Sequence, residues 1–274
     1  MIRSRLNKRL PESVKVGYIT LRLRFSPSFD RTRRVVQQYD DFFHRLFTSG
    51  AILLFALMVL MAFSLLARIR VIPETGITTL AGSLWGVTPI GFSLTGVLII
   101  LTSIVAIIVP HEFGHVIASF IYGAEVEQVG VILLFGFLPV MAYVKNSQEN
   151  NGENPHAQLR IAAGGITMQG LLGLALLPLV VLLFSGIPTS GAVAGASYGV
   201  AAQLVTVMFY LNIEIAFLNA IPISLLDGGS AYRSLSRIVD QYITQTLEET
   251  GVYANMMMAK RAALILGFAA VFVS

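Results

Sequence analysis

The chain contains no cysteine and few charged residues, and both shortages restrict what it can be. Without cysteine it forms no disulfide, no thiolate zinc site and no cysteine nucleophile, so any metal must be bound by nitrogen and oxygen ligands. Charged residues make up 12% of the chain, hydrophobic residues 55%, and the mean hydropathy is +0.74. Soluble globular proteins carry about 25% charged residues. The composition therefore indicates a protein of the lipid bilayer, and we expect no nucleic-acid partner.

Long apolar runs follow a polar N-terminal segment. About 20 apolar residues are needed to span a bilayer. The last run has only 13 residues before the chain ends, so we expect its helix to be incomplete as given. The runs predict an all-α polytopic membrane protein, a helical bundle of about five to six spans, with a basic segment at 1–46 and a membrane-embedded domain at 47–274. The five runs cover 47–67, 92–121, 161–185, 197–223 and the residues from 262 onward.

The first 46 residues form a basic segment with eleven Lys or Arg against four Asp or Glu. Alternating side chains from Val16 to Phe25 predict a short strand, and the stretch from Asp30 to His44 predicts an amphipathic or surface helix. A basic segment of this kind can lie against anionic lipid head groups. The alternative is that it binds a specific partner.

Lysine and arginine are distributed unevenly between the loops that join the runs. If the N-terminus is cytoplasmic, the cytoplasmic loops carry 17 Lys and Arg, and the outer loops carry only Arg68 and Arg70. Cytoplasmic loops are usually the richer in these residues. We therefore expect a multi-pass protein with a cytoplasmic N-terminus.

A shorter apolar stretch at 126–144 contains Gly130 and Pro139 and is too broken to span the bilayer. It is more typical of a re-entrant hairpin than of a span, and such a hairpin is tolerated at membrane depth where other protein covers its backbone or where it lines a wet cavity. A hairpin has an unpaired strand edge, on which an extended peptide can add as a further strand. We expect proline at Val131 or Leu133 to block that addition.

Two clusters of ionisable residues lie within apolar sequence, where charge is usually functional. His111, Glu112 and His115 belong to one H-E-F-G-H stretch, and Asp227 follows 112 residues later. The i, i+4 spacing places both imidazoles on one helix face, where they can share a zinc ion while Glu112 acts on a water. Asp227 is the candidate third ligand. The alternatives are histidines that only hydrogen-bond within a bundle and an ordinary Asp-Gly turn.

Other residues near these clusters fit a site at membrane depth. Pro222 breaks a helix five residues before Asp227, and broken helices often mark sites in membranes. Gly114 keeps its surface small, so that another helix or the hairpin can approach. Pro110 removes a backbone donor and is expected to kink its helix. Glu214 is either a neutral carboxyl bonded to a neighbouring helix or part of a water path.

H-E-x-x-H followed by N-x-x-P-x-x-x-L-D-G resembles the site-2 protease family of intramembrane zinc metalloproteases. The resemblance implies a zinc site of His111, His115 and Asp227. It also implies Glu112 as the catalytic acid/base and Asn219 as a residue that helps to hold the substrate backbone.

The resemblance further implies a catalytic core at about 92–235 and identifies 126–144 as the family's membrane-inserted hairpin. Many members carry A-G-P-x-x-N on the helix between the two metal-binding segments. Here that stretch begins at Ala163, and Gly165 and Met168 replace the proline and the asparagine. Thr167 or Gln169 is then the candidate for the missing polar contact.

The expected function is that of an intramembrane zinc endopeptidase. It would hydrolyse a peptide bond within or near a transmembrane helix of a membrane protein, as in regulated intramembrane proteolysis. The expected cofactor is Zn²⁺, the expected partners are a transmembrane protein substrate and the lipid bilayer, and the active site is expected toward the cytoplasmic side. Two alternatives are a noncatalytic membrane transporter or scaffold with a buried metal site, and a membrane-anchored zincin that cuts cytosolic peptides.

Overall fold

The computed structural model has four helices long and apolar enough to cross a membrane among the residues it describes. They coincide with the first four apolar runs and confirm the polytopic helical class, whereas the run from 262 lies outside the described residues. The four are α3 (Asp40–Arg68), α5 (Leu94–Ile121), α6 (Pro155–Ser185) and α7 (Val200–Asn219). The described residues are 13–16, 20–25, 28–68, 93–135, 138–146, 154–185, 199–224 and 226–250.

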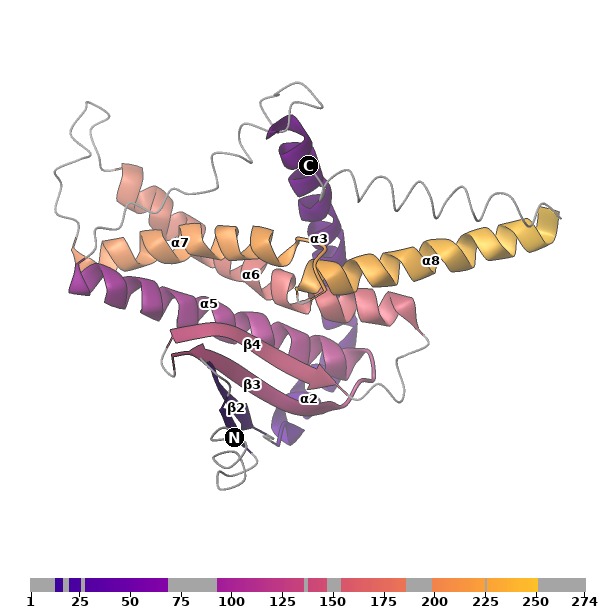
Figure 1. Cartoon of the computed structure of the whole chain (residues 1–274), viewed down its shortest axis with the longest axis horizontal. Coiled ribbons are helices and arrows are strands. Elements are labelled where there is room, and N and C mark those ends of the chain that lie inside the picture. Colours follow the sequence, from indigo (N-terminus) through magenta and orange to yellow (C-terminus); the bar gives the residue numbers. More distant parts are fainter. Residues whose placement is uncertain are drawn as a thin grey trace.

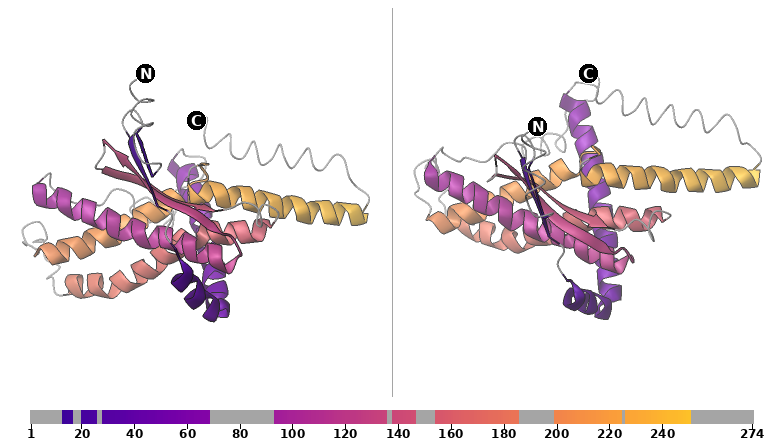
Figure 2. Two further views of the ribbon diagram at one scale, coloured as in Figure 1. Left: turned by 90° about the horizontal axis from the view of Figure 1, so that it is seen from below. Right: turned by 60° about the horizontal axis from the view of Figure 1, so that its bottom comes forward.

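Helices α5, α6 and α7 lie side by side and alternate in direction, while α3 crosses them (Figure 1). The more polar α8 (Asp227–Thr250) begins against α6 and extends away from the bundle in every view (Figure 2). One buried cluster joins α3, α6 and the start of α8, and another joins α3, α5 and the short helix α2 (Asp30–Gln38). These clusters fix the start of α8 and the C-terminal part of α5 against the bundle.

Glycine permits the close contact between α5 and α6. A Cβ atom on Gly114 would lie 2.2 Å from the carbonyl oxygen of Gly164, and a Cβ on Gly164 would lie 2.6 Å from the carbonyl oxygen of Gly114. The two backbones therefore touch, as small residues allow at helix contacts in membranes. This confirms the expectation for Gly114 and identifies α6 as its neighbour. Helix α5 continues through Pro110.

The N-terminal segment forms two strands and a helix. β2 (Thr20–Phe25) lies within the strand predicted from Val16 to Phe25, whereas β1 (Val14–Val16) overlaps that prediction only at Val16. The helix predicted up to His44 ends at Gln38, and α3 already begins at Asp40. Tyr39 leaves the helical conformation, and two aspartates occupy the first turn of α3, where negative charge is favourable.

The predicted hairpin is present as β3 (Val126–Leu134) and β4 (Leu138–Asn146), within a four-stranded antiparallel sheet of order β1-β2-β3-β4. β2 pairs with the outer edge of β3, so that Leu23 lies opposite Val131 and Leu21 opposite Leu133. The prediction that proline at Val131 or Leu133 would test an open strand edge is therefore wrong. Within the described residues the sheet ends at β4, which lies along α5 (Figure 1).

Candidate metal centre

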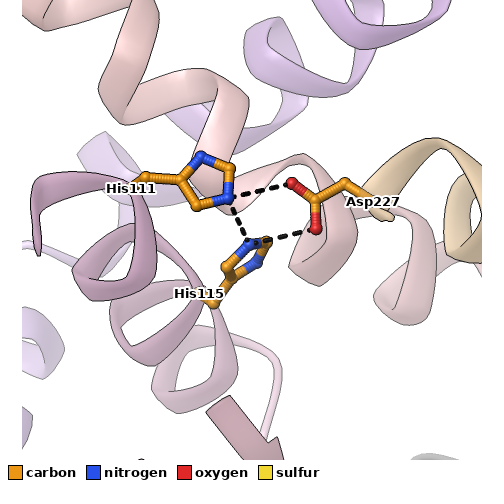
Figure 3. A group of neighbouring side chains, drawn as sticks. All are labelled: His111, His115 and Asp227. Atoms are coloured by element: carbon orange, nitrogen blue, oxygen red, sulfur yellow. Dashed lines mark hydrogen bonds and ion pairs between the residues drawn. The ribbon is translucent and has the colours of Figure 1, made fainter. Parts of the chain in front are cut away.

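Helix α5 presents His111 and His115 on one buried face, with 5% and 9% of their surfaces exposed. The two Nε2 atoms lie 3.3 Å apart and point toward the same space (Figure 3). The spacing of four residues explains this arrangement, since it returns the second side chain to the face of the first after about one turn. The geometry expected from the H-E-x-x-H motif is present.

Asp227 reaches the same space from the first residue of α8. Helix α7 ends at Asn219, and the chain turns through Pro222 before α8 begins. A Cβ on Gly228 would lie 2.3 Å from the carbonyl oxygen of Ala220, and a Cβ on Gly229 would lie 2.1 Å from that of Ile223. The glycines let α8 fold tightly against this turn. Asp227 thus begins a helix and does not form the ordinary interfacial turn considered from the sequence.

The three side chains meet at distances that fit one metal ion. Asp227 Oδ2 lies 3.2 Å from His111 Nε2, and Asp227 Oδ1 lies 3.2 Å from His115 Nε2. Two ligand atoms bound to a tetrahedral zinc, each about 2.1 Å from it, lie about 3.4 Å apart. Within the described residues, His111, His115 and Asp227 form a group of side chains close enough together to hold a metal ion.

The hydrogen bond of His115 fixes which ring nitrogen is available. Its Nδ1 lies 2.8 Å from the backbone carbonyl oxygen of Ile161, which can only accept, so Nδ1 carries the proton. Nε2 is then left with a lone pair that points at a carboxylate and at a second imidazole nitrogen. A proton or a metal ion between these atoms offsets the repulsion of their lone pairs, and a backbone partner for the outer nitrogen is typical of metal-binding histidines.

The two imidazoles favour the charged form of the Asp227 side chain. Burial alone would raise the pKa of its carboxyl group, but the adjacent His115 and His111 outweigh burial and hold that pKa well below its ordinary value. Asp227 therefore supplies the carboxylate oxygens that a zinc ligand requires.

Gly165 and Asn219 complete the surroundings of His111. A Cβ on Gly165 would lie 2.2 Å from Cε1 of the His111 ring, so the absence of a side chain makes room for the imidazole. The Asn219 amide nitrogen lies 3.4 Å from His111 Nε2, which places Asn219 at the edge of the cluster. The structure thus brings the predicted site residues together from α5, α7 and α8.

Glu112 lies next to these three side chains and interacts electrostatically with all of them. It is partly exposed, unlike the two histidines. Glu112 thus lies beside the candidate metal site but is not one of the three side chains that converge on it. Its carboxylate can therefore accept or donate a proton.

Neither residue suggested as a replacement for the family's helix motif contacts the metal cluster through a hydrogen bond. The Thr167 hydroxyl donates to the carbonyl of Ala163 in its own helix. The Gln169 side chain is buried, and its amide atoms have no hydrogen-bond partner among the described residues. Gly165 itself has the clearest role, which sequence reasoning missed. Its position one residue after Gly164 was the available signal.

Apolar helices around a buried cluster of two histidines and an aspartate define a polytopic membrane protein with a candidate metal centre. The model of peptidase family M50 matches residues 99–260, more than half of the chain, and this range includes both motifs. The chain belongs to peptidase family M50, the site-2 protease family. Membership supports a membrane metalloprotease. No curated protein and no solved structure gave a match.

Proposed function

We propose that this protein is an intramembrane zinc endopeptidase that cuts a peptide bond within or next to a transmembrane helix of another membrane protein. The observation that carries the proposal is the meeting of Asp227, at the start of α8, with His111 and His115 beside Glu112 on α5, a helix apolar enough to cross a membrane. A buried charged cluster in such helices is costly unless it is paired or serves a function. Metal-assisted hydrolysis uses all four side chains together.

Each residue has a distinct part in the proposed reaction. His111, His115 and Asp227 would hold the zinc ion, which when bound acidifies a water and polarises a carbonyl group. Glu112 would take a proton from the attacking water and deliver it to the leaving amide nitrogen. Asn219 would donate its amide N–H to the substrate backbone at the edge of the cluster.

The sheet supplies a place for an unwound substrate. A transmembrane helix hides its carbonyl groups in hydrogen bonds, and an opened segment needs new partners for them at membrane depth. β4 is an end strand of the sheet within the described residues and packs along α5, the helix that carries both histidines. We propose that the scissile segment adds to β4 as a further strand.

The decisive experiment compares the wild type with Glu112→Gln on a model single-span substrate in vesicles, together with a measurement of bound zinc. We expect about one zinc per chain in both proteins and turnover reduced by about 100-fold or more in the variant, because general acid/base assistance is typically worth that much. Near-normal cleavage by Glu112→Gln would refute the assigned role of this residue.

The same assay separates the alternatives. A noncatalytic transporter or scaffold would bind metal but cleave no substrate in its wild-type form. A membrane-anchored zincin would cut a soluble cytosolic peptide as well as the single-span substrate, and its cleavage sites would lie outside the apolar segment.

A further inference from the structure

Three buried polar side chains lie in the bundle beyond the metal centre. Ser103, Gln169 and Asn212 are 0%, 1% and 3% exposed and come from α5, α6 and α7. The Ser103 hydroxyl, both amide atoms of Gln169 and the Asn212 carbonyl oxygen have no hydrogen-bond partner among the described residues. A buried donor or acceptor that is left unpaired loses its hydrogen bonds to water without replacement, which destabilises the fold.

Gln169 and Asn212 are neighbours across the contact between α6 and α7. The Asn212 amide nitrogen donates to the backbone carbonyl of Gln169 at 2.9 Å, which fixes Asn212 with its own carbonyl oxygen unused. Gly173 lies beside them, since a Cβ there would be 3.3 Å from the Asn212 nitrogen. One amide nitrogen donor and two carbonyl acceptors without a partner thus lie on neighbouring residues, beside a glycine that adds no side chain.

The pair lies close to the metal centre and is aligned with it. Gln169 follows Gly165 by one helical turn, about 6 Å along α6, and Gly165 contacts the His111 ring. Asn212 precedes Asn219 by two turns, so both asparagines share one face of α7, and Asn219 contacts His111. Gln169 and Asn212 therefore lie within one and two helical turns of residues that contact His111.

We propose that Gln169 and Asn212 form an internal water site that hydrates the metal centre from within the bundle. Water fits because it donates and accepts, and buried waters typically make about three hydrogen bonds to groups that are otherwise unpaired. A substrate backbone does not fit, because the two side chains are almost fully covered. The water site itself does not depend on the proposed function, whereas its part in the reaction, supplying water for hydrolysis, does.

Oxidation by hydroxyl radicals, generated from water by brief X-ray exposure, tests the site. Met208 precedes Asn212 by one turn and is the reporter, and Met58 on α3 is the internal reference. In the wild type Met208 is oxidised faster than Met58. In Gln169→Leu/Asn212→Leu that excess is lost, because the apolar side chains retain no water. Asn212→Leu alone serves the same purpose should the double variant fail to fold.

Thr167→Val is the matched control, because Thr167 is buried on the same helix with its hydroxyl bonded to its own backbone. It leaves Met208 oxidation unchanged. In the cleavage assay the double variant keeps its zinc and loses about tenfold in kcat, equivalent to about 1.4 kcal/mol.

Equal Met208 oxidation in the wild type and the double variant would overturn the water site. Lost oxidation with unchanged kcat would overturn its part in the reaction. Absence of cleavage by the wild type would refute the proposed function, and oxidation would still decide whether the water site exists.

Discussion

Asp227 is the one side chain of the candidate metal cluster that α5 does not supply, so it would link a bound metal to the start of α8. Substituting Asp227→Ala removes the carboxylate and leaves two histidines, fewer than the three protein ligands of a catalytic zinc site. We expect zinc affinity to fall by at least tenfold, about 1.4 kcal/mol, and cleavage to be abolished. Metal analysis after dialysis measures the first effect. Full zinc occupancy and activity would exclude Asp227 from the site.

Gly165 offers a test of how tightly the His111 ring is held. In Gly165→Ala the added methyl group would meet the ring at 2.2 Å, so the imidazole must move away from its partners. We expect weaker zinc binding and a lower kcat, with protein yield less affected. Gly170→Ala is the control on the same helix, because its nearest contact is a leucine methyl group at 3.3 Å. Equal zinc affinity in the two variants would show that Gly165 does not position His111.

At the scale of residues, the sequence predicted the site residues that can be recognised within one segment, by their spacing or by their charge in apolar surroundings. The spacing of His111 and His115 determines their common face, and Asp227 is conspicuous in an apolar setting. Gly165 and the carbonyl of Ile161 could not be found in this way. Their contacts with the histidines depend on how α6 packs against α5, and no pattern within either helix specifies that packing.

At the scale of elements, the hairpin at 126–144 was predictable, but its neighbour was not. Glycine, proline and a length too short to span indicated two strands locally. The pairing of β2 with β3 joins segments about a hundred residues apart, and alternation in β2 does not identify its partner strand. This pairing moves the expected substrate edge from β3 to β4.

Proline substitutions at two neighbouring positions of β4 test whether the substrate adds to the outer edge of this strand. Successive residues of an edge strand direct their N–H groups in opposite directions, one toward β3 and one outward. Ala142 and Tyr143 are successive residues of β4, so the N–H of one points toward β3 and the N–H of the other points outward. Proline at the first removes a hydrogen bond within the sheet, and proline at the second removes only an outward donor. We expect the second kind to keep its fold and zinc while cleavage of a single-span substrate falls.

Hydrogen exchange of the sheet amides identifies which of the two variants preserves the β3–β4 pairing. Undiminished cleavage by that variant would contradict strand addition at β4. The zinc chemistry would be unaffected, because β4 contributes no group to the metal cluster.

At the scale of the whole molecule, substrate helicity should control the rate. The scissile segment must leave its helix before it can pair with β4, so opening that helix adds to the barrier. Glycine or proline near the cut lowers helix stability by about 1 and 3 kcal/mol relative to alanine. We expect such substrates to be cleaved faster than alanine-substituted ones, measured as kcat/KM in vesicles. Rates independent of these substitutions would indicate that helix opening is not part of the rate-limiting barrier.

The absence of cysteine makes the orientation of the molecule directly testable, because the unaltered chain provides a background without thiols. The excess of Lys and Arg in one set of loops predicts that the N-terminus and α8 lie on the cytoplasmic side. Ser28→Cys and Gln241→Cys should therefore react with an impermeant maleimide only after intact cells are opened. Thr189→Cys, in the segment 186–196 between the third and fourth apolar runs, which this orientation places outside, should react in intact cells. Labelling of Ser28→Cys and Thr189→Cys from the same side would refute this orientation and the cytoplasmic position proposed for the active site.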